Sequence, residues 1–272
     1  METHSSDGAR VVRIAAIGDI HFDAGTRGAL RELFTEVNQE AHVLLLTGDL
    51  TTHGKPEQIR GFVEELAGVD IPVVTVLGNH DYEAGAEDEI TRILCDAGVE
   101  VLDGTHTVVN GIGFAGTKGF AGGFGRGALG PFGEALIKNF VNEAVEEALK
   151  IEKAMRNLTT DTRIVVLHYA PIVDTVIGEP EMIYPFLGSS RMVQPIDTLG
   201  ATAVFHGHAH HGTARGETPG GVPVYNVAWP LLRQAGAHFL LYEVAAPERR
   251  HDRGEVAVRQ AAPGADRPAP QP

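Results

Sequence analysis

Apolar runs and helical patterns alternate through the first hundred residues of the chain. Three short runs rich in β-branched residues predict buried strands over 12–17, 43–46 and 71–77. The segments between them, 29–38 and 56–66, have the apolar spacing of helices. Strand-helix-strand alternation of this kind predicts a parallel sheet with right-handed crossovers. Ligand-binding groups in such sheets gather at the carboxyl ends of the strands.

The second half of the chain combines one long helix with further strands. Apolar residues recur along one face of the predicted helix 134–158, and the opposite face, which includes Glu147, is expected to be solvated. Later apolar runs predict a second sheet packed on the first, with the last two runs forming a closing hairpin. These runs cover 163–167, 203–206, 222–227, 238–244 and 255–259.

Two long segments lack a clear period. Gly111–Gly133 is rich in glycine, and we expect either a flexible connection or a lid from which Lys118 or Arg126 reaches a phosphate. Pro171–Pro195 carries apolar side chains and is expected to form a specificity loop over the site. Its Arg191 is either a surface arginine or a phosphate clamp.

Composition narrows the function classes. The chain has 272 residues, 43% of them hydrophobic, and a formal net charge of -14, which disfavours a broad surface for duplex nucleic acid. Cys95 is the only cysteine, so an intramolecular disulfide and a cysteine-based zinc site are excluded. We expect Cys95 to be buried in a helix.

The ends of the chain suggest one domain with polar tails. We expect a domain over 11–260, flanked by disordered tails at 1–10 and 261–272. The first apolar run is too short to span a membrane and lacks the flanks of a signal peptide, so a cytoplasmic protein is expected.

Five short segments at the ends of predicted strands carry side chains that bind metal ions. They are Gly18-Asp19-Ile20-His21, Gly48-Asp49, Gly78-Asn79-His80-Asp81, His168 and Gly207-His208-Ala209-His210. Carboxylate, amide and imidazole ligands together suit Mn, Fe or Zn better than Ca, and they suit a two-metal centre that hydrolyses phosphate esters. Asp19 and His21, two residues apart at a strand end, are expected to point the same way.

The order and composition of these segments resemble the calcineurin-like metallophosphoesterase superfamily over residues 17–212. The resemblance implies an α/β fold, a four-layer α/β/β/α sandwich of two mixed sheets with the metal site at the strand carboxyl ends. It implies two divalent or mixed-valence ions and a bridging carboxylate at Asp49. The ligands implied for one ion are Asp19, His21 and His210, and those for the other are Asn79, His168 and His208.

Further histidines take roles from the same resemblance. His80 resembles the family's outer-sphere histidine, which contacts the scissile phosphate and protonates the leaving oxygen. His206 lies two positions before His208, so in an extended segment it would point to the same side, and it is the next ligand candidate. His211 is expected to face the other way, as a neighbour or substrate contact at most.

One departure from the motifs of the superfamily indicates to which branch the chain is most similar. Thr52 and His53 stand where the Ser/Thr protein phosphatases have Asp-Arg, so that branch is disfavoured. A carboxylate partner for His80 is then missing at position 52, and Asp81 is a candidate substitute. The chain most resembles the small phosphodiesterases of the superfamily.

The resemblance therefore implies a phosphodiesterase that acts on a small phosphorylated substrate through a metal-bridging hydroxide. The alternatives are a phosphomonoesterase on a small metabolite and, less favoured, a non-catalytic protein-binding module on the same fold. Nuclease activity is disfavoured by the acidic balance. The sequence leaves the oligomeric state open.

Overall fold

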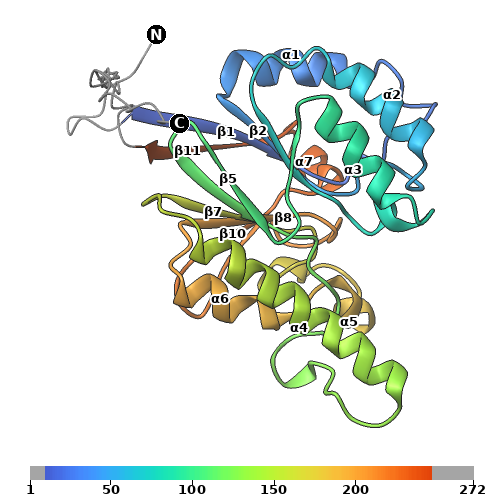
Figure 1. Ribbon diagram of the computed structural model, residues 1–272, viewed down its shortest axis with the longest axis vertical. Helices are drawn as coiled ribbons and strands as arrows, with labels where there is room; N and C mark the ends of the chain where they lie inside the picture. The colour runs from blue at the N-terminus through green and yellow to red at the C-terminus, as the bar shows by residue number, and fades with distance from the viewer. Residues whose placement is uncertain (1–9, 247–272) are drawn as a thin grey trace, which may run out of the picture.

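The three N-terminal apolar runs form neighbouring parallel strands, as the sequence predicts. The computed structural model describes residues 10–246, and in it these strands are β1 (Arg10–Ile17), β2 (Val43–Thr47) and β3 (Val73–Val76). β2 and β3 are buried along their whole length, because helices cover one face of the sheet and a second sheet covers the other (Figure 1).

The edges of the first sheet differ from the expectation. The short strand β4 (Glu100–Val101) extends it in parallel beside β3, and β11 (Leu240–Ala246) pairs antiparallel with β1. The run 238–244 was predicted to join the second sheet, and that assignment is wrong. Antiparallel β11 supplies hydrogen bonds to the free side of β1, a pairing that no local signal reveals. Its predicted hairpin partner, 255–259, lies outside the described residues.

The second sheet is mixed and contains the other predicted strands. Its order is β5-β6-β7-β8-β10-β9, in which the four inner strands are parallel and the two outer strands are antiparallel to their neighbours. The bounds are β5 (Thr105–Val109), β6 (Ile112–Gly116), β7 (Arg163–Val166), β8 (Ala203–His206), β9 (Arg215–Glu217) and β10 (Pro223–Asn226).

The start of the glycine-rich segment is a buried strand rather than a loop. β6 lies inside the second sheet, between β5 and β7. A Cβ on Gly116 would lie 2.8 Å from Val76 Cγ1 and 2.9 Å from Leu102 Cβ, so a residue without a side chain is needed where the two sheets touch. Glycine has a low strand propensity, and the same residues that permit this packing therefore hide the strand in the sequence.

Helices complete two outer layers (Figure 1). α1 (Arg31–Glu40), α2 (Pro56–Leu66) and α3 (Glu87–Asp96) cover the first sheet, and α4 (Ala135–Arg156) and α6 (Val193–Thr198) cover the second. The shorter helices are α5 (Tyr184–Leu187) and α7 (Trp229–Gln234). The predicted four-layer α/β/β/α arrangement of two mixed sheets is confirmed.

Two further observations concern the helices. α3 buries Ile90 and Leu94 and exposes Cys95, so the predicted burial of this cysteine is wrong. Within residues 10–246, no helix combines the length and apolar character needed to cross a bilayer.

Glu147 corrects the expected solvated face of α4. Its side chain is 1% exposed and accepts hydrogen bonds from Thr117 Oγ1 at 2.6 Å and from the Gly119 backbone N–H at 2.7 Å. Lys150 Nζ donates to it at 2.7 Å. The helical period alone placed Glu147 among charged neighbours, whereas the segment that follows β6 supplies buried donors for its carboxylate.

Replacing Glu147 by Ala is therefore expected to lower the free energy of unfolding by about 1–3 kcal/mol, because the buried Gly119 N–H would be left without an acceptor, while Thr117 Oγ1 keeps only its longer bond to Asp103 Oδ1 at 3.1 Å. Urea denaturation followed by circular dichroism measures this change. Glu146→Ala, on the exposed face of the same helix, is the matched control and should change stability by no more than about 0.5 kcal/mol. Equal effects of the two substitutions would contradict the assigned role.

Candidate metal centre

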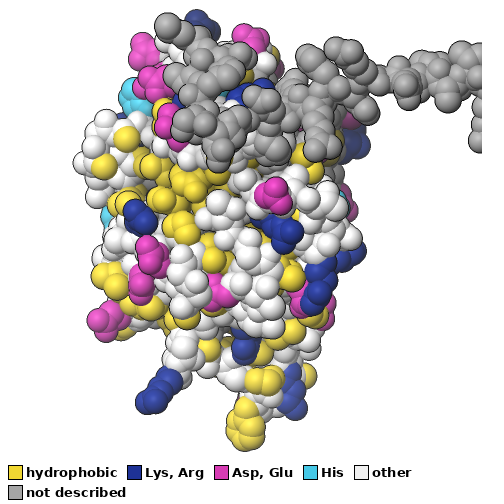
Figure 2. All heavy atoms as spheres, turned by 90° about the vertical axis from the view of Figure 1, so that its left-hand side faces the viewer, with side chains coloured by type: hydrophobic (Ala, Val, Ile, Leu, Met, Phe, Trp, Pro, Cys, Tyr) yellow, Lys and Arg dark blue, Asp and Glu magenta, His cyan; other side chains and the backbone are white. Residues whose placement is uncertain are grey.

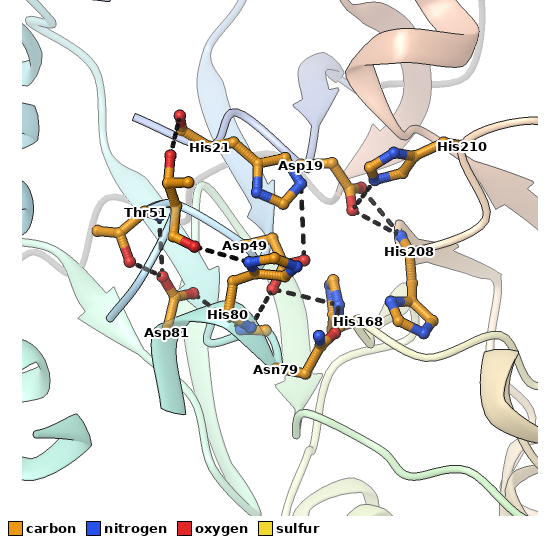
Figure 3. Close-up of polar contacts among 12 residues, drawn as sticks. Asp19, His21, Asp49, Thr51, Asn79, His80, Asp81, His168, His208 and His210 are labelled. Atoms are coloured by element: carbon orange, nitrogen blue, oxygen red, sulfur yellow. Dashed lines mark hydrogen bonds and ion pairs between the residues drawn. The ribbon is translucent and has the colours of Figure 1, made fainter. Parts of the chain in front are cut away.

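All five motif segments converge where the carboxyl ends of the two sheets meet (Figure 3). Asp19, Asp49 and Asn79 follow β1, β2 and β3 of the first sheet, and His168 and His208 follow β7 and β8 of the second. The parallel strands all run toward the same edge, so side chains that lie up to 191 positions apart in the chain come into contact.

The potential ligand atoms form overlapping groups. Asp19, His21 and His210 offer atoms that all lie within 4.8 Å of one another, and so do Asp49, His168 and His208. Asp49 also forms such a group with His21 and His80, which places it between the first two groups (Figure 3).

Asn79 belongs with the second group. Its Oδ1 lies 2.8 Å from His168 Nε2. The structure thus brings together the seven side chains that the resemblance implies as ligands and His80.

Backbone carbonyls orient two of the histidines. His168 Nδ1 lies 2.9 Å from Thr47 O, and His208 Nε2 lies 3.2 Å from Phe186 O. A carbonyl only accepts, so each of these nitrogens carries the hydrogen and the other ring nitrogen keeps its lone pair. The lone pairs therefore belong to His168 Nε2 and His208 Nδ1. Outer contacts of this kind fix the orientation and tautomer of metal-binding histidines.

The atoms at the centre are acceptors that face one another. His168 Nε2 lies 2.8 Å from Asn79 Oδ1 and 3.4 Å from Asp49 Oδ1. His21 Nε2 is buried with no hydrogen-bond partner among the described residues, and it lies 3.8 Å from Asp49 Oδ2. Lone pairs this close together repel unless a cation lies between them, so the donor set fits metal ions.

The electrostatics favour the ligand forms of the histidines. Burial lowers the pKa of His21 to about 4, and burial with the neighbouring His208 lowers the pKa of His168. Burial alone would raise the pKa of Asp19, but the hydrogen bond with His210 and the surrounding imidazoles lower it to about 2. Neutral imidazoles and ionised carboxylates are the forms that bind metals.

Asp49 has the opposite tendency. Burial raises its pKa, and the charges of Asp19 and Asp81 raise it further. A bound cation reverses this balance, because its positive charge offsets both the desolvation and the repulsion between carboxylates. Asp49 is thus the side chain with most to gain from a metal ion.

Four of the side chains in the centre belong to residues with left-handed backbone conformation. Asp19, His21, Asp49 and His208 have φ values of 57°, 49°, 49° and 69°. Asp19 and His21 follow the end of β1 and are not part of it, so strand alternation was the wrong reason for expecting them to point together. They converge because both adopt this uncommon conformation, in which Asp and His are several-fold enriched.

Asp81 ties the loop after β2 to the loop after β3. Its buried carboxylate accepts from the backbone N–H groups of Leu50, Thr51 and Gly78 at 3.2, 2.9 and 2.9 Å, and from Thr51 Oγ1 at 2.7 Å. A Cβ on Gly78 would collide with Asp49, so the close approach of the two loops also needs this glycine. Asp81 is therefore fully engaged and is not the partner of the His80 ring.

Thr52 supplies that partner through its backbone. His80 Nδ1 donates to Thr52 O at 2.7 Å, and the His80 backbone N–H donates to Asp49 Oδ1 at 2.8 Å. Glu83 Oε2 lies 3.8 Å from the same ring nitrogen and is itself bound by His53 at 3.1 Å. The His80 side chain is 39% exposed, which leaves it accessible from the solvent side of the centre.

His206 and His211 lie outside these groups. His206 is fully buried and contacts Gly207 O through Nδ1 and Thr175 Oγ1 through Nε2, each at 2.8 Å. It therefore holds the loop that carries His208. His211 is exposed, and its backbone N–H donates to Glu179 Oε1 at 2.7 Å.

The basic candidates make local contacts. Lys118 Nζ donates to Gly119 O at 2.9 Å and lies 4.8 Å from the centre of the Phe120 ring. Arg191 donates to Leu129 O at 2.9 Å, which links the two irregular segments and favours a surface role over a phosphate clamp. Sequence reasoning missed Tyr169, whose ring centre lies 4.5 Å from that of His208. An aromatic residue directly after His168 was the available signal.

Replacing Asp81 by Asn is expected to lower the free energy of unfolding by about 1–3 kcal/mol, because the new amide group would place donors against backbone N–H donors. Metal affinity should fall as well, since the loop that carries Asp49 loses its anchor. Isothermal calorimetry with Mn²⁺ and urea denaturation measure the two effects. Asp88→Asn, an exposed residue of α3, is the matched control, and unchanged metal affinity in Asp81→Asn would contradict the assignment.

Known structures share the architecture. The phosphopantetheinyl hydrolase of Mycobacterium tuberculosis superposes with a TM-score of 0.61 at 14% identity, covering 92% of this chain and 98% of that one. The protein TT1561 of Thermus thermophilus gives a TM-score of 0.53 at 16% identity, covering 86% and 99%. A putative 5'-nucleotidase of Staphylococcus aureus gives 0.52 at 13% identity, covering 79% and 48%. At such identities these similarities establish the fold.

Sequence comparison assigns the family. No curated protein matches the chain. The model of the calcineurin-like phosphoesterase family matches residues 12–212, which include every segment that contributes to the metal centre. The chain belongs to the calcineurin-like phosphoesterase family and is a metal-dependent phosphoester hydrolase.

Proposed function

We propose that this protein is a dinuclear-metal phosphodiesterase that acts on a small phosphorylated substrate. The observation that carries the proposal is the position of Asp49, which belongs to one group with His168 and His208 and to another with His21. A carboxylate shared in this way suits a bridging ligand. Asp19, His21 and His210 would hold one ion, and Asn79, His168 and His208 would hold the other.

The donor set supports a choice of metals. Imidazoles are mixed with carboxylates and one amide oxygen, which suits Mn, Fe or Zn in divalent or mixed-valence pairs. When bound, two such ions supply an activated water and neutralise charge that develops on the phosphoryl oxygens.

The residues of the chain have separate tasks in the proposed reaction. Thr47 O and Phe186 O keep His168 and His208 in the tautomers that bind metal. Thr52 O fixes Nδ1 of His80, so Nε2 is the atom that would give a proton to the leaving oxygen. The partial exposure of His80 gives a substrate access to that atom.

The single most informative experiment compares hydrolysis of bis(p-nitrophenyl) phosphate and p-nitrophenyl phosphate with Mn²⁺, together with metal analysis of the purified protein. We expect two metal ions per chain and a higher kcat/KM for the diester. Asp49→Asn should lose both metal occupancy and at least about a hundredfold in kcat/KM, because one residue serves both ions. Monoester preference would indicate a phosphatase instead. No turnover with any divalent ion would indicate a binding module.

His80 is the side chain that distinguishes proton donation from metal binding. His80→Gln should keep both metal ions and lower kcat by about 10²–10⁴-fold, the usual contribution of a general acid. The matched control is His53→Gln, which removes a neighbouring exposed imidazole and should leave kcat nearly unchanged. A loss of metal from His80→Gln would make His80 a ligand and overturn its assignment as the acid.

A further inference from the structure

Exposed apolar side chains gather at one end of the molecule. Of the twelve large apolar side chains that are exposed within residues 10–246, eight lie in 129–136 or 173–186. Figure 2 shows hydrophobic side chains at the lower end of the molecule, where Figure 1 places the loop before α4 and the start of α4. Gly122 links the two segments, because its backbone N–H donates to Pro185 O at 2.7 Å and its carbonyl accepts from the Leu129 N–H at 2.7 Å. An apolar surface gathered in this way is typical of a binding site.

Three of these side chains form a strip that we call the rim strip, namely Met182, Ile183 and Phe186. A 3₁₀ turn, Glu181–Ile183, continues directly into α5. Side chains three and four positions apart lie on the same side of such turns, so Phe186 is adjacent to the other two. Their exposed fractions are 88% for Met182, 38% for Ile183 and 61% for Phe186.

The rim strip begins beside the metal centre. Phe186 O accepts the hydrogen bond from His208 Nε2, so the residue that orients a metal-binding histidine also presents an exposed ring. Leu187, the next residue, is buried with Val176 and Ala209 and anchors the segment. A group that extends from a phosphate at the centre toward α5 would therefore meet a fixed apolar surface.

We propose that the rim strip binds an apolar group of the substrate, so that the substrate is an amphiphilic phosphate ester with an alkyl or similar hydrocarbon chain. This inference rests on the proposed phosphoesterase function and names its substrate class. The alternative of an anionic membrane surface is disfavoured by charge. Glu179 and Glu181 directly precede the strip in the sequence, and the chain as a whole has a net charge of -14.

The test uses p-nitrophenyl alkyl phosphodiesters with methyl and hexyl groups, at concentrations below micelle formation. For the wild-type protein with Mn²⁺ we expect KM for the hexyl ester to be lower by about tenfold or more, because each buried methylene favours binding. Met182→Ser should bring the ratio of the two KM values toward one. Val108→Ser, an exposed apolar residue on β5, is the matched control and should keep the wild-type ratio.

The outcomes separate this inference from the proposed function. Equal KM values for the two esters in the wild-type protein would overturn the substrate class while leaving the phosphodiesterase in place. If the protein hydrolysed none of the three diesters, namely the methyl ester, the hexyl ester and bis(p-nitrophenyl) phosphate, the proposed phosphodiesterase function itself would be overturned. Two other results would assign the strip to a different occupant and overturn the inference. If Met182→Ser changed the oligomeric state and left the KM ratio unchanged, the occupant would be a second copy of the chain. If the wild-type protein sedimented with phosphatidylglycerol vesicles, and Met182→Ser lost this sedimentation with the KM ratio unchanged, the occupant would be a membrane surface.

Discussion

The burial of Asp49 among other acceptors is the constraint on which the rest of the site depends. Its carboxylate lies between two groups of ligand atoms, and both burial and the charges of Asp19 and Asp81 oppose its ionisation. The backbone N–H of His80 donates one hydrogen bond to Asp49 Oδ1, which offsets only part of this opposition. Carbonyls at Thr47 and Phe186 turn lone pairs of histidines toward the same region. A buried carboxylate without a positively charged partner is costly, so this arrangement favours the binding of cations.

The site also depends on contact between the two sheets. Asp19, Asp49 and Asn79 come from the first sheet, whereas His168, His208 and His210 come from the second. Neither sheet alone supplies all the side chains of either proposed ligand set. Close packing at Gly116 brings the two sheets together, and Asp81 fixes the loops that carry Asp49 and Asn79 relative to each other.

The sequence predicted the parallel core of the first sheet and the candidate ligands, because both have local signatures. Runs of β-branched residues indicate buried strands, and candidate ligands such as Asp49 and His168 are recognised by their residue type and their motif. What the sequence did not predict has no such signature. The pairing of β11 with β1 depends on distant edges. The partner of His80 is the carbonyl of Thr52, and every residue type has a carbonyl. Glu147 lies on a charged helix face and finds its donors in another segment.

The left-handed backbone at four candidate ligand positions restricts which residues can replace them. Asp, Asn and His tolerate positive φ better than other side chains, and the same residues are good metal ligands. Two independent requirements, a tolerance of positive φ and the ability to bind a metal ion, are thus met together at Asp19, His21, Asp49 and His208. Replacing Asp49 by Glu would keep the negative charge, but Glu tolerates positive φ less well than Asp. We therefore expect these positions to accept few residue types, whereas the residues of the rim strip do not have positive φ and carry no such backbone restriction.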